Sequence, residues 1–353
     1  MYLLTLSSHI DRAEAHVLAA LRARGLKLLV MCRPETANLD VIREAGIPVK
    51  PLCLKGRIDR DGIAAIQATL AAHPASVIHS FNKNALSNAL LATKGMSIRH
   101  TTYRGIVGNL SPWNPETRLL FFNRRVAHIV CVCEAVRQSL LEIGVSPAKA
   151  VRIYKGHKPE WYQPAQRQAL SALGPPPDAT ILGSAARWRP RKGLSVLLRA
   201  LCQLSRPDLH LVVAGKIPAR DKKWIMQHPL LKKTVHLTGD TPDAPALMGA
   251  CDLFIMPSLR REGLAKSVIE AMIQGVPAIV SHSGGLAEIV PHEVGGLVVP
   301  PGNVKHLAMA IQRLTDDQPL RQTFRTGALD HIRRTFPFEQ TVTQYQDLFL
   351  SLA

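Results

Sequence analysis

The chain has 353 residues, 46% of them hydrophobic and 20% charged, and this composition excludes a disordered or fibrous protein. The length exceeds the size at which one hydrophobic core stops growing, so two domains are expected. A formal net charge of +18 indicates an anionic partner: a phosphorylated small molecule, a nucleic acid or a membrane surface. Aromatic residues make up only 5% of the chain, so a base-stacking surface for nucleic acid is not expected.

Short apolar runs alternate with amphipathic stretches through the first half of the chain. The runs are MYLLTL, KLLVMC, SVIHSF, IRHTTYR and HIVCVC, which begin at residues 1, 27, 76, 98 and 128. This alternation predicts a parallel sheet flanked by helices. The first run lacks a basic segment before it and is typical of a strand, not of a signal peptide, so we expect a cytoplasmic protein.

The six cysteines do not form a C-x-x-C pair, so no disulfide framework is expected. Cys131 and Cys133 lie two apart on a predicted strand, and their side chains would share one face. A C-x-C metal site is the alternative, but no further ligand pair stands near them in the sequence. We interpret both as buried thiols.

A glycine and three consecutive prolines, residues 174–177, separate the first half from a second series of apolar runs. These runs are ATILGSAA, LHLVVAG, TVHLTG, DLFIMPS and PAIVSH, beginning at residues 179, 209, 234, 252 and 277. The predicted fold class is α/β, with two doubly wound, Rossmann-like domains whose strands end at a shared cleft. We expect the first domain over residues 1–165, completed by an amphipathic helix over about 338–353, and the second over 175–337.

Two glutamates stand eight residues apart in the stretch REGLAKSVIEAMIQG. Glu262 precedes, and Glu270 lies within, a helix expected to begin between Leu264 and Ser267 and to end at Gly275. If the whole interval were helical, about 12 Å would separate them, more than the roughly 5 to 9.5 Å of glycosidase carboxylate pairs. They are therefore suited to accept hydrogen bonds from hydroxyls at the two ends of an elongated ligand. Between them, the helix start offers N–H groups to an anionic centre, as in a nucleotide diphosphate sugar. From spacing alone, two surface glutamates on an ordinary helix remain the alternative.

The segment REGLAKSVIEAMIQGVPAIVSHSGGLAEIVPHEVGGLVVPPGN resembles the E-x7-E signature and Gly-Gly segment of retaining glycosyltransferase family 4, which has the GT-B fold. AARWRPRKGLSVLLRAL, LHLVVAGK, TVHLTGD and LMGACDLFIMPS resemble further family segments in the same order. The resemblance covers roughly residues 125 to 315 well and the first hundred residues loosely.

The resemblance implies roles for residues that match the family pattern. Arg187 and Lys192 would bind the donor diphosphate and neutralise the leaving group, and Glu262 would bind hydroxyls of the transferred sugar. Glu270 would bind the ribose hydroxyls. The remaining donor-side residues are Gly263, Leu264, Ala265, Lys266, Ser267, Gly215 and Thr238. The family needs neither a metal nor a cofactor besides the nucleotide sugar that serves as donor.

The first half departs from the family pattern. Asp11 and Arg12 stand where glycines are common, and Arg104 precedes Gly105 where a histidine is common, so Arg104 and Gly105 are the acceptor-side candidates. Lys155 and Gly156 replace an Asn-Gly pair, and GLAKS replaces a common G-F-G-L segment. Asp59 and Asp61 form a D-x-D sequence among arginines, which we interpret as a polar loop and not as a metal site.

These observations predict a metal-independent, retaining hexosyltransferase that acts on a glycan or glycolipid acceptor in lipopolysaccharide or surface polysaccharide biosynthesis. A sugar-nucleotide epimerase, a phosphorylase and a non-catalytic basic glycolipid-binding protein are the alternatives. Cationic side chains of the first half predict peripheral attachment to the inner face of the cytoplasmic membrane: Lys55, Arg57, Arg60, Arg99, Arg104, Arg124 and Arg125. A small phosphorylated acceptor and a host-wide basic bias stay open as explanations of the charge.

Overall fold

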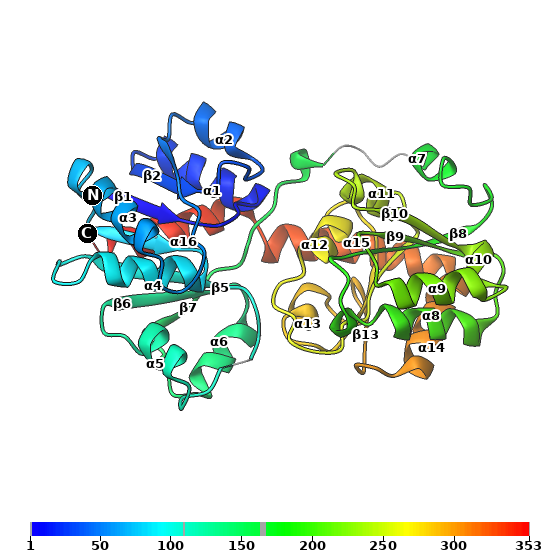
Figure 1. The fold of residues 1–353 in the computed structure, drawn as a ribbon. Coiled ribbons are helices and arrows are strands. Elements are labelled where there is room, and N and C mark those ends of the chain that lie inside the picture. The colour runs from blue at the N-terminus through cyan, green and yellow to red at the C-terminus, as the bar shows by residue number, and fades with distance from the viewer. Residues whose placement is uncertain (1, 109, 163–166, 353) are drawn as a thin grey trace. The chain divides into compact units, whose positions relative to one another are not determined.

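A computed structural model describes residues 2–108, 110–162 and 167–352 of the chain (Figure 1). The chain divides into two compact units: Met1–Gly156 with Phe338–Ala353, and His157–Pro337. Each unit is built around one parallel sheet with helices packed on it. The proline-rich stretch of residues 174–177 lies inside the second unit.

The first unit contains a seven-stranded sheet in the order β3-β2-β1-β4-β5-β6-β7. Its strands are β1 (Tyr2–Leu6), β2 (Lys27–Cys32), β3 (Val49–Pro51), β4 (Val77–Ser80), β5 (Arg99–Arg104), β6 (Val126–Cys131) and β7 (Ala150–Arg152). Its helices are α1 (Arg12–Ala23), α2 (Leu39–Glu44), α3 (Arg60–Ala72), α4 (Lys83–Ala92), α5 (Pro115–Phe121), α6 (Glu134–Leu141) and α16 (Phe338–Leu350).

The second unit contains a six-stranded sheet in the order β10-β9-β8-β11-β12-β13. Its strands are β8 (Thr180–Ala185), β9 (Leu209–Ala214), β10 (Val235–Gly239), β11 (Leu253–Met256), β12 (Ala278–Ser281) and β13 (Gly296–Val299). Its helices are α7 (Gln168–Ser171), α8 (Leu194–Leu204), α9 (Ala219–Gln227), α10 (Leu231–Thr234), α11 (Ala244–Gly249), α12 (Lys266–Met272), α13 (Leu286–Ile289), α14 (Val304–Asp316) and α15 (Gln318–Thr335), with 3-10 turns η1 (Pro159–Trp161) and η2 (Pro190–Lys192).

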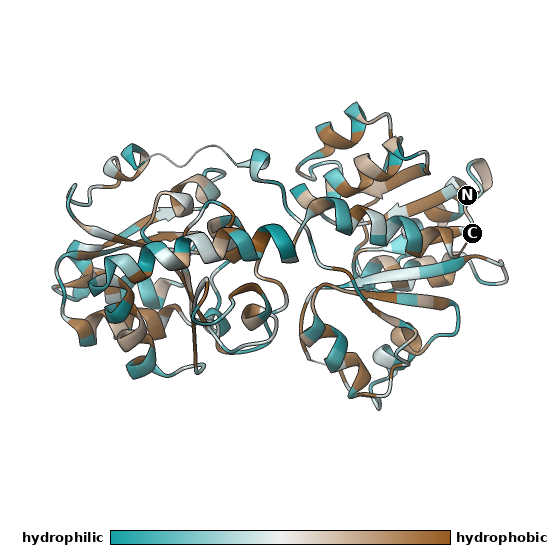
Figure 2. Cartoon of the chain, turned by 180° about the vertical axis from the view of Figure 1, so that it is seen from behind, coloured by the Kyte–Doolittle hydropathy of each residue, from teal (hydrophilic) through white to brown (hydrophobic). Residues whose placement is uncertain are grey.

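The strands are apolar because helices cover both faces of each parallel sheet. All residues of β9, β11 and β12 are buried, and most strands are brown in Figure 2 while the helices carry a teal face. The predicted strand runs in both halves coincide with strands of the two sheets. The α/β class with two doubly wound sheets is thus confirmed.

The C-terminal helix α16 belongs to the first unit, although it is the last element of the chain. Val342, Tyr345 and Phe349 are buried on its inner face. On its outer side the guanidinium of Arg24, from the end of α1, donates to Glu339 at 3.1 Å. An amphipathic helix at this position was predicted from the spacing of its apolar residues.

The strand order reverses direction once in each sheet. In the second unit the reversal lies between β8 and β11, and in the first unit it lies between β1 and β4. In open parallel sheets, ligands bind beyond the carboxyl ends of the strands at this switch point. The loops after β8 and β11, and those after β1 and β4, are therefore the places to look for a site.

Cys131 and Cys133 are fully buried, as expected, and none of the six cysteines forms a disulfide. Cys131 ends β6, but Cys133 lies beyond the predicted strand, at the N-cap of α6. Within the described residues, every helix falls short of the length and apolar character that a membrane span requires.

Candidate functional site

The switch point of the second sheet brings the predicted donor-side residues to one edge. Arg187 and Lys192 lie on the loop and 3-10 turn after β8, and Glu262 lies on the loop after β11. β8 and β11 pair in parallel through Leu182 and Leu253, so their carboxyl ends meet at the same edge. Residues some seventy positions apart in sequence thus become neighbours.

A glycine allows these two loops to approach each other closely. Gly193 has a φ of +77°, and a Cβ atom built on it would lie 2.0 Å from the carbonyl oxygen of Pro257. Any other residue would combine a disfavoured backbone conformation with this clash. Beside this contact, the backbone N–H of Leu259 donates to the carbonyl of Arg191 at 2.7 Å. Backbone contacts therefore fix the distance between the loops.

The carboxylate of Glu262 is held by partners on both loops. Lys192 Nζ donates to Oε1 at 2.7 Å, and the hydroxyl of Ser258 donates to Oε2 at 3.0 Å. Arg191 Nη1 lies 3.6 Å from Oε2, too far for a hydrogen bond but close enough for charge attraction. Glu262 is only 6% exposed. A buried carboxylate requires such partners, because its uncompensated charge would be costly.

Further backbone contacts hold the loop that carries Glu262. The backbone carbonyl of Glu262 accepts from the N–H of Gly285 at 3.3 Å, and this bond ties the loop to the Gly-Gly segment after β12. The hydroxyl of Ser281, at the end of β12, donates to the carbonyl of Ser258. The Gly-Gly segment noted in the sequence thus supports the loop of Glu262.

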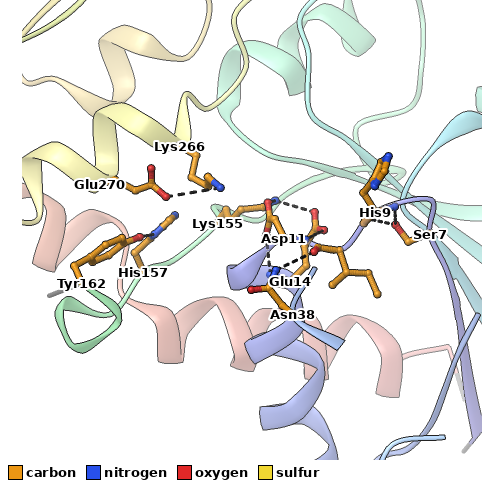
Figure 3. A network of polar contacts seen from close by, with 11 residues as sticks. Ser7, His9, Asp11, Glu14, Asn38, Lys155, His157, Tyr162, Lys266 and Glu270 are labelled. Carbon is orange, nitrogen blue, oxygen red and sulfur yellow. Dashed lines mark hydrogen bonds and ion pairs between the residues drawn. The ribbon is translucent and has the colours of Figure 1, made fainter. Parts of the chain in front are cut away.

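The helix that follows is α12, and it begins at Lys266, within the predicted interval. Glu262 precedes the helix and Glu270 lies inside it, as expected from the sequence. The carboxylate of Glu270 lies 3.7 Å from Lys266 Nζ, one turn earlier on the same face (Figure 3). Ala265, the N-cap, supplies no side-chain hydrogen bond to the first turn. The short segment between Glu262 and α12 contains Gly263 and Leu264, and Ser267 lies in the first turn of the helix.

A pocket of about 880 Å³ opens beside these loops at the ends of β8 and β9. Arg187, Gly215, Lys216 and Asp240 are among its lining residues. A Cβ atom on Gly215 would lie 2.1 Å from the carbonyl of Ala186, so only glycine lets the wall take this shape. Thr238 is not part of the lining, and its hydroxyl donates to the carbonyl of Gly239 at 3.0 Å.

Arg104, the acceptor-side candidate, is buried at the carboxyl end of β5 in the first unit. Its guanidinium lies over the ring of Phe121 at 5.4 Å and donates to the carbonyl of Gly108. Its Nε has no hydrogen-bond partner among the described residues. Burial lowers the pKa of Arg104 to about 10, so it remains a cation at neutral pH. Gly105 follows it, where a Cβ atom would lie 2.9 Å from the ring of Tyr103.

The loop after β1 forms a charged cluster where the family often has glycines. Asp11 caps α1 and forms a reciprocal capping box with Glu14. Lys155 Nζ lies between these carboxylates, at 2.6 Å from Asp11 and 2.8 Å from Glu14 (Figure 3). Burial opposes the charge of Lys155, but the carboxylates of Glu14 and Asp11 outweigh burial and raise its pKa. Asp11 and Lys155, two residues at which the sequence departs from the pattern that the resemblance implies, thus contact each other.

Asp59 of the D-x-D sequence caps α3. Its carboxylate accepts from the backbone N–H groups of Lys55 at 2.8 Å and Gly62 at 3.1 Å, and these bonds lower its pKa. Asp61 is exposed and lies 3.8 Å from Lys55 Nζ. No group of three or more His, Cys, Asp or Glu residues in the described part of the chain is arranged to hold a metal ion.

Two family models match the chain, one described as Glycosyltransferase Family 4 over residues 13–161 and one as Glycosyl transferases group 1 over residues 166–330. The chain belongs to glycosyltransferase family 4. The structure has the GT-B fold, as does that of Anabaena HepE in complex with UDP and glucose, with a TM-score of 0.84, 22% identity and coverage of 99% of this chain and 100% of that one.

Two curated relatives bear more specific names. The lipopolysaccharide core biosynthesis glycosyltransferase LpsD of Rhizobium meliloti is 32% identical over 53% of this chain and 54% of its own length. A D-inositol 3-phosphate glycosyltransferase of Saccharomonospora viridis is 28% identical over 67% of this chain and 58% of its own length. The matched region therefore spans little more than half the length of these relatives.

Sequence reasoning missed the residues that hold Glu262. Ser258 and Arg191 carry no signal of their own, because their role depends on the pairing of β8 with β11. The capping box of Asp11 and Glu14 was visible as a D-x-x-E pattern before the first helix, but its third member, Lys155, lies 141 positions beyond Glu14.

Proposed function

We propose that this protein transfers a sugar from a nucleotide diphosphate sugar to a hydroxyl group of a glycan or glycolipid acceptor, with retention of anomeric configuration and without a metal. The observation that carries the proposal is the contact of Lys192 with Glu262 at 2.7 Å at the switch point of the second sheet. In such a site the cation can stabilise the negative charge of the diphosphate, and the neighbouring carboxylate can accept hydrogen bonds from sugar hydroxyls.

The donor is proposed to lie across this edge. Its nucleoside enters the pocket lined by Gly215, Lys216 and Asp240, its diphosphate meets Arg187 and Lys192, and its sugar hydroxyls bind Glu262. Glu270 accepts from the ribose hydroxyls. Diphosphate binding then competes with Glu262 for Lys192, which leaves the carboxylate free to accept from the sugar.

In the proposed reaction the bond from the anomeric carbon to the phosphate oxygen breaks and a bond to the acceptor oxygen forms on the same face. The departing phosphate oxygen takes the proton of the acceptor hydroxyl. Arg187 and Lys192 stabilise the negative charge that accumulates on the diphosphate, and such preorganised charges commonly account for about 10²-fold or more in rate. This front-face course is what the family resemblance implies.

The acceptor is proposed to be a lipid-linked glycan, as in lipopolysaccharide or surface polysaccharide biosynthesis, and the protein to work at the inner face of the cytoplasmic membrane. The name of LpsD supports a lipopolysaccharide acceptor. The name of the S. viridis relative supports a small phosphorylated acceptor instead, which a chain of net charge +18 would also attract.

The decisive experiment is a binding and turnover screen with purified protein and a panel of nucleotide sugars, beginning with UDP-glucose because HepE was solved with UDP and glucose. A donor at 100 times its dissociation constant is expected to add about 2.7 kcal/mol of stability. Transfer to an acceptor supports the proposal, whereas phosphate-dependent cleavage or release of an epimerised nucleotide sugar would support a phosphorylase or an epimerase. EDTA should leave the rate unchanged.

A further inference from the structure

Four large apolar side chains are exposed on one region of the first unit. Trp113 is 84% exposed, Ile58 73%, Leu119 68% and Phe122 37%. Exposed apolar residues are common singly, but a group of them indicates an interaction surface. The other large apolar residues exposed in the described second unit, Met226, Val294 and Met309, lie on separate elements.

Three of the four residues lie on helix α5 or next to its ends. Trp113 lies in the turn before the helix, Leu119 lies in the helix, and Phe122 is its C-cap. Leu119 and Phe122 are three positions apart and are therefore neighbours on one side of the helix. The opposite side buries Thr117, Leu120 and Phe121 against the unit. The packing of α5 therefore requires only the buried side, and the exposed apolar side is not explained by the fold.

A polar contact fixes Ile58 beside this helix. The guanidinium of Arg57 donates to the carboxylate of Glu116 on α5 and to the side chain of Asn84 on α4. Lys83 Nζ donates to the other oxygen of Glu116 at 2.6 Å. The loop that carries Ile58 follows β3 and α5 follows β5, so both belong to the carboxyl edge of the first sheet.

Cations surround these apolar residues. Lys55, Arg60, Arg118 and Arg124 are exposed on the same loop, on α3, on α5 and just beyond it. Three described carboxylates lie among them. Glu116 binds Arg57 and Lys83, and Asp59 caps α3. Asp61 is exposed and lies 3.8 Å from Lys55 Nζ, so it offsets part of the charge of Lys55. We call this surface the α5 rim; it comprises Ile58, Trp113, Leu119 and Phe122 with Lys55, Arg60, Arg118 and Arg124.

We propose that the α5 rim is the surface by which this protein docks onto an anionic lipid bilayer. Trp and Phe side chains prefer the interface between headgroups and acyl chains, and Leu and Ile add apolar area that inserts there. Arginine and lysine beside them complement the lipid phosphates, and their attraction fades within a Debye length. A protein partner without charge would gain nothing from the surrounding cations.

The inference deepens the proposed function, because it rests on the acceptor being held in a lipid surface and names the part of the chain that would meet that surface. The α5 rim lies on the carboxyl edge of the first sheet, the edge where parallel sheets bind their ligands. Docking there would present this edge to the headgroups that carry an acceptor. Membrane binding is measured without donor or acceptor, so its failure can be told apart from failure of the transfer reaction.

The test is flotation of the whole chain with vesicles of phosphatidylcholine alone and of phosphatidylcholine mixed with phosphatidylglycerol. Binding is expected only with the anionic lipid and is expected to be lost at high salt. The double variant Trp113→Ser and Leu119→Ser should bind about tenfold more weakly, since its apolar contribution is reduced. The matched control Met226→Ser and Met309→Ser removes two exposed apolar residues of the second unit and should bind as the parent does.

The cations are tested with Arg118→Gln and Arg124→Gln against Arg333→Gln and Arg334→Gln, two exposed arginines at the end of α15. Only the first pair should weaken binding and reduce its dependence on salt. Equal binding by the α5 rim variants and the parent would overturn the proposal. Concentration-dependent dimerisation of the parent without lipid, abolished by Trp113→Ser and Leu119→Ser, would overturn it in favour of a second copy as partner.

Trp113 also provides a direct probe, because the other three tryptophans, at 161, 188 and 224, lie in the second unit. Brominated anionic lipid should quench part of the tryptophan fluorescence of the parent. In Trp113→Phe, a variant that keeps an aromatic side chain, this quenching should be absent. Identical quenching in both would show that the docking surface lies elsewhere. Circular dichroism of each variant verifies that it is folded.

Discussion

The six strands of the second sheet have the same order as the first six strands of the first sheet, but the carboxyl edges of the two sheets are built differently. In the second unit the edge at the switch point consists of buried, paired charges, with Glu262 between Lys192 and Ser258. In the first unit the corresponding loop holds Lys155 between Asp11 and Glu14, while the α5 rim farther along the edge exposes apolar and cationic side chains. The loops, and not the sheet, therefore decide what each edge can bind.

Glycines show the same contrast. Gly193 and Gly215 adopt positive φ where a Cβ atom would lie 2.0 and 2.1 Å from a carbonyl oxygen, so the backbone itself shapes the edge of the second unit. Gly25 and Gly144 of the first unit also adopt positive φ, but nothing lies within 4 Å of their Cβ positions. They end helices or turns without bringing two loops together.

The largest expected effect tests this contrast through stability. Gly193→Ala should lower the free energy of unfolding by about 3 kcal/mol or more, because backbone strain and a clash with Pro257 add. Gly25→Ala carries the strain without the clash and should cost only about 1 kcal/mol. Urea unfolding of both variants measures the difference. Equal losses would mean that close approach of the loops contributes nothing.

Removing the carboxylate of Glu262, at the carboxyl edge of the second sheet, should lower the rate of sugar transfer more than the affinity for the donor. Glu262→Ala is expected to lower the rate of transfer by about 10²-fold or more, because the contact to the sugar is lost in the transition state. UDP affinity should be retained, since Lys192 is then released for the diphosphate. Initial rates and calorimetry check both parts, and a variant as active as the parent would remove Glu262 from the mechanism.

The first unit should be the more sensitive one to acid. Burial holds the pKa of His79 and that of His100 at about 3, below the 6.5 of an unfolded chain. Between these values the unfolded state binds protons that the folded state does not, so stability falls as the pH drops from 6.5 toward 3. At pH 5 the loss is about 2 kcal/mol for each histidine.

Urea unfolding at pH 7 and pH 5 measures this loss. His100→Asn should reduce the difference between the two pH values, whereas His306→Asn, at an exposed position on α14, should leave it unchanged. A pH dependence that is the same in all three proteins would contradict the role of buried histidines.

The cations at the carboxyl edge of the second sheet should strengthen nucleotide binding. Lys192→Ala and Arg187→Ala are each expected to weaken UDP binding about tenfold and to slow transfer, because a charge facing the phosphates is removed. Lys305→Ala, an exposed residue of α14, is the matched control. Unchanged UDP affinity in Lys192→Ala would indicate that Lys192 serves only to hold Glu262.

The smallest expected effect concerns Ser258, which we infer to orient Glu262. Ser258→Ala should slow transfer about fivefold, in line with one hydrogen bond worth about 1 kcal/mol. The KM for the donor should change little, because the hydroxyl is bonded to the protein. Ser258→Thr, which keeps the hydroxyl, should recover part of the rate; no recovery would point to a packing role.

Much of the fold and part of the site could be predicted from local patterns. The start of α12 at Lys266, with Glu262 before it and Glu270 within it, follows from apolar periodicity, although the helix ends at Met272, before the predicted Gly275. The apolar run around Cys131 and Cys133 likewise indicates that both thiols are buried. The periods of helices and strands are properties of neighbouring residues, so a single sequence carries them.

The contacts that define each edge depend on residues far apart in the chain. Lys192 meets Glu262 across 70 positions, Arg57 meets Glu116 across 59, and Asp11 meets Lys155 across 144. Each pair arises because strands that are distant in sequence end at one edge of a sheet. Sequence by itself determined the elements and the chemical types at their ends; strand order, which no local pattern encodes, decided which of them meet.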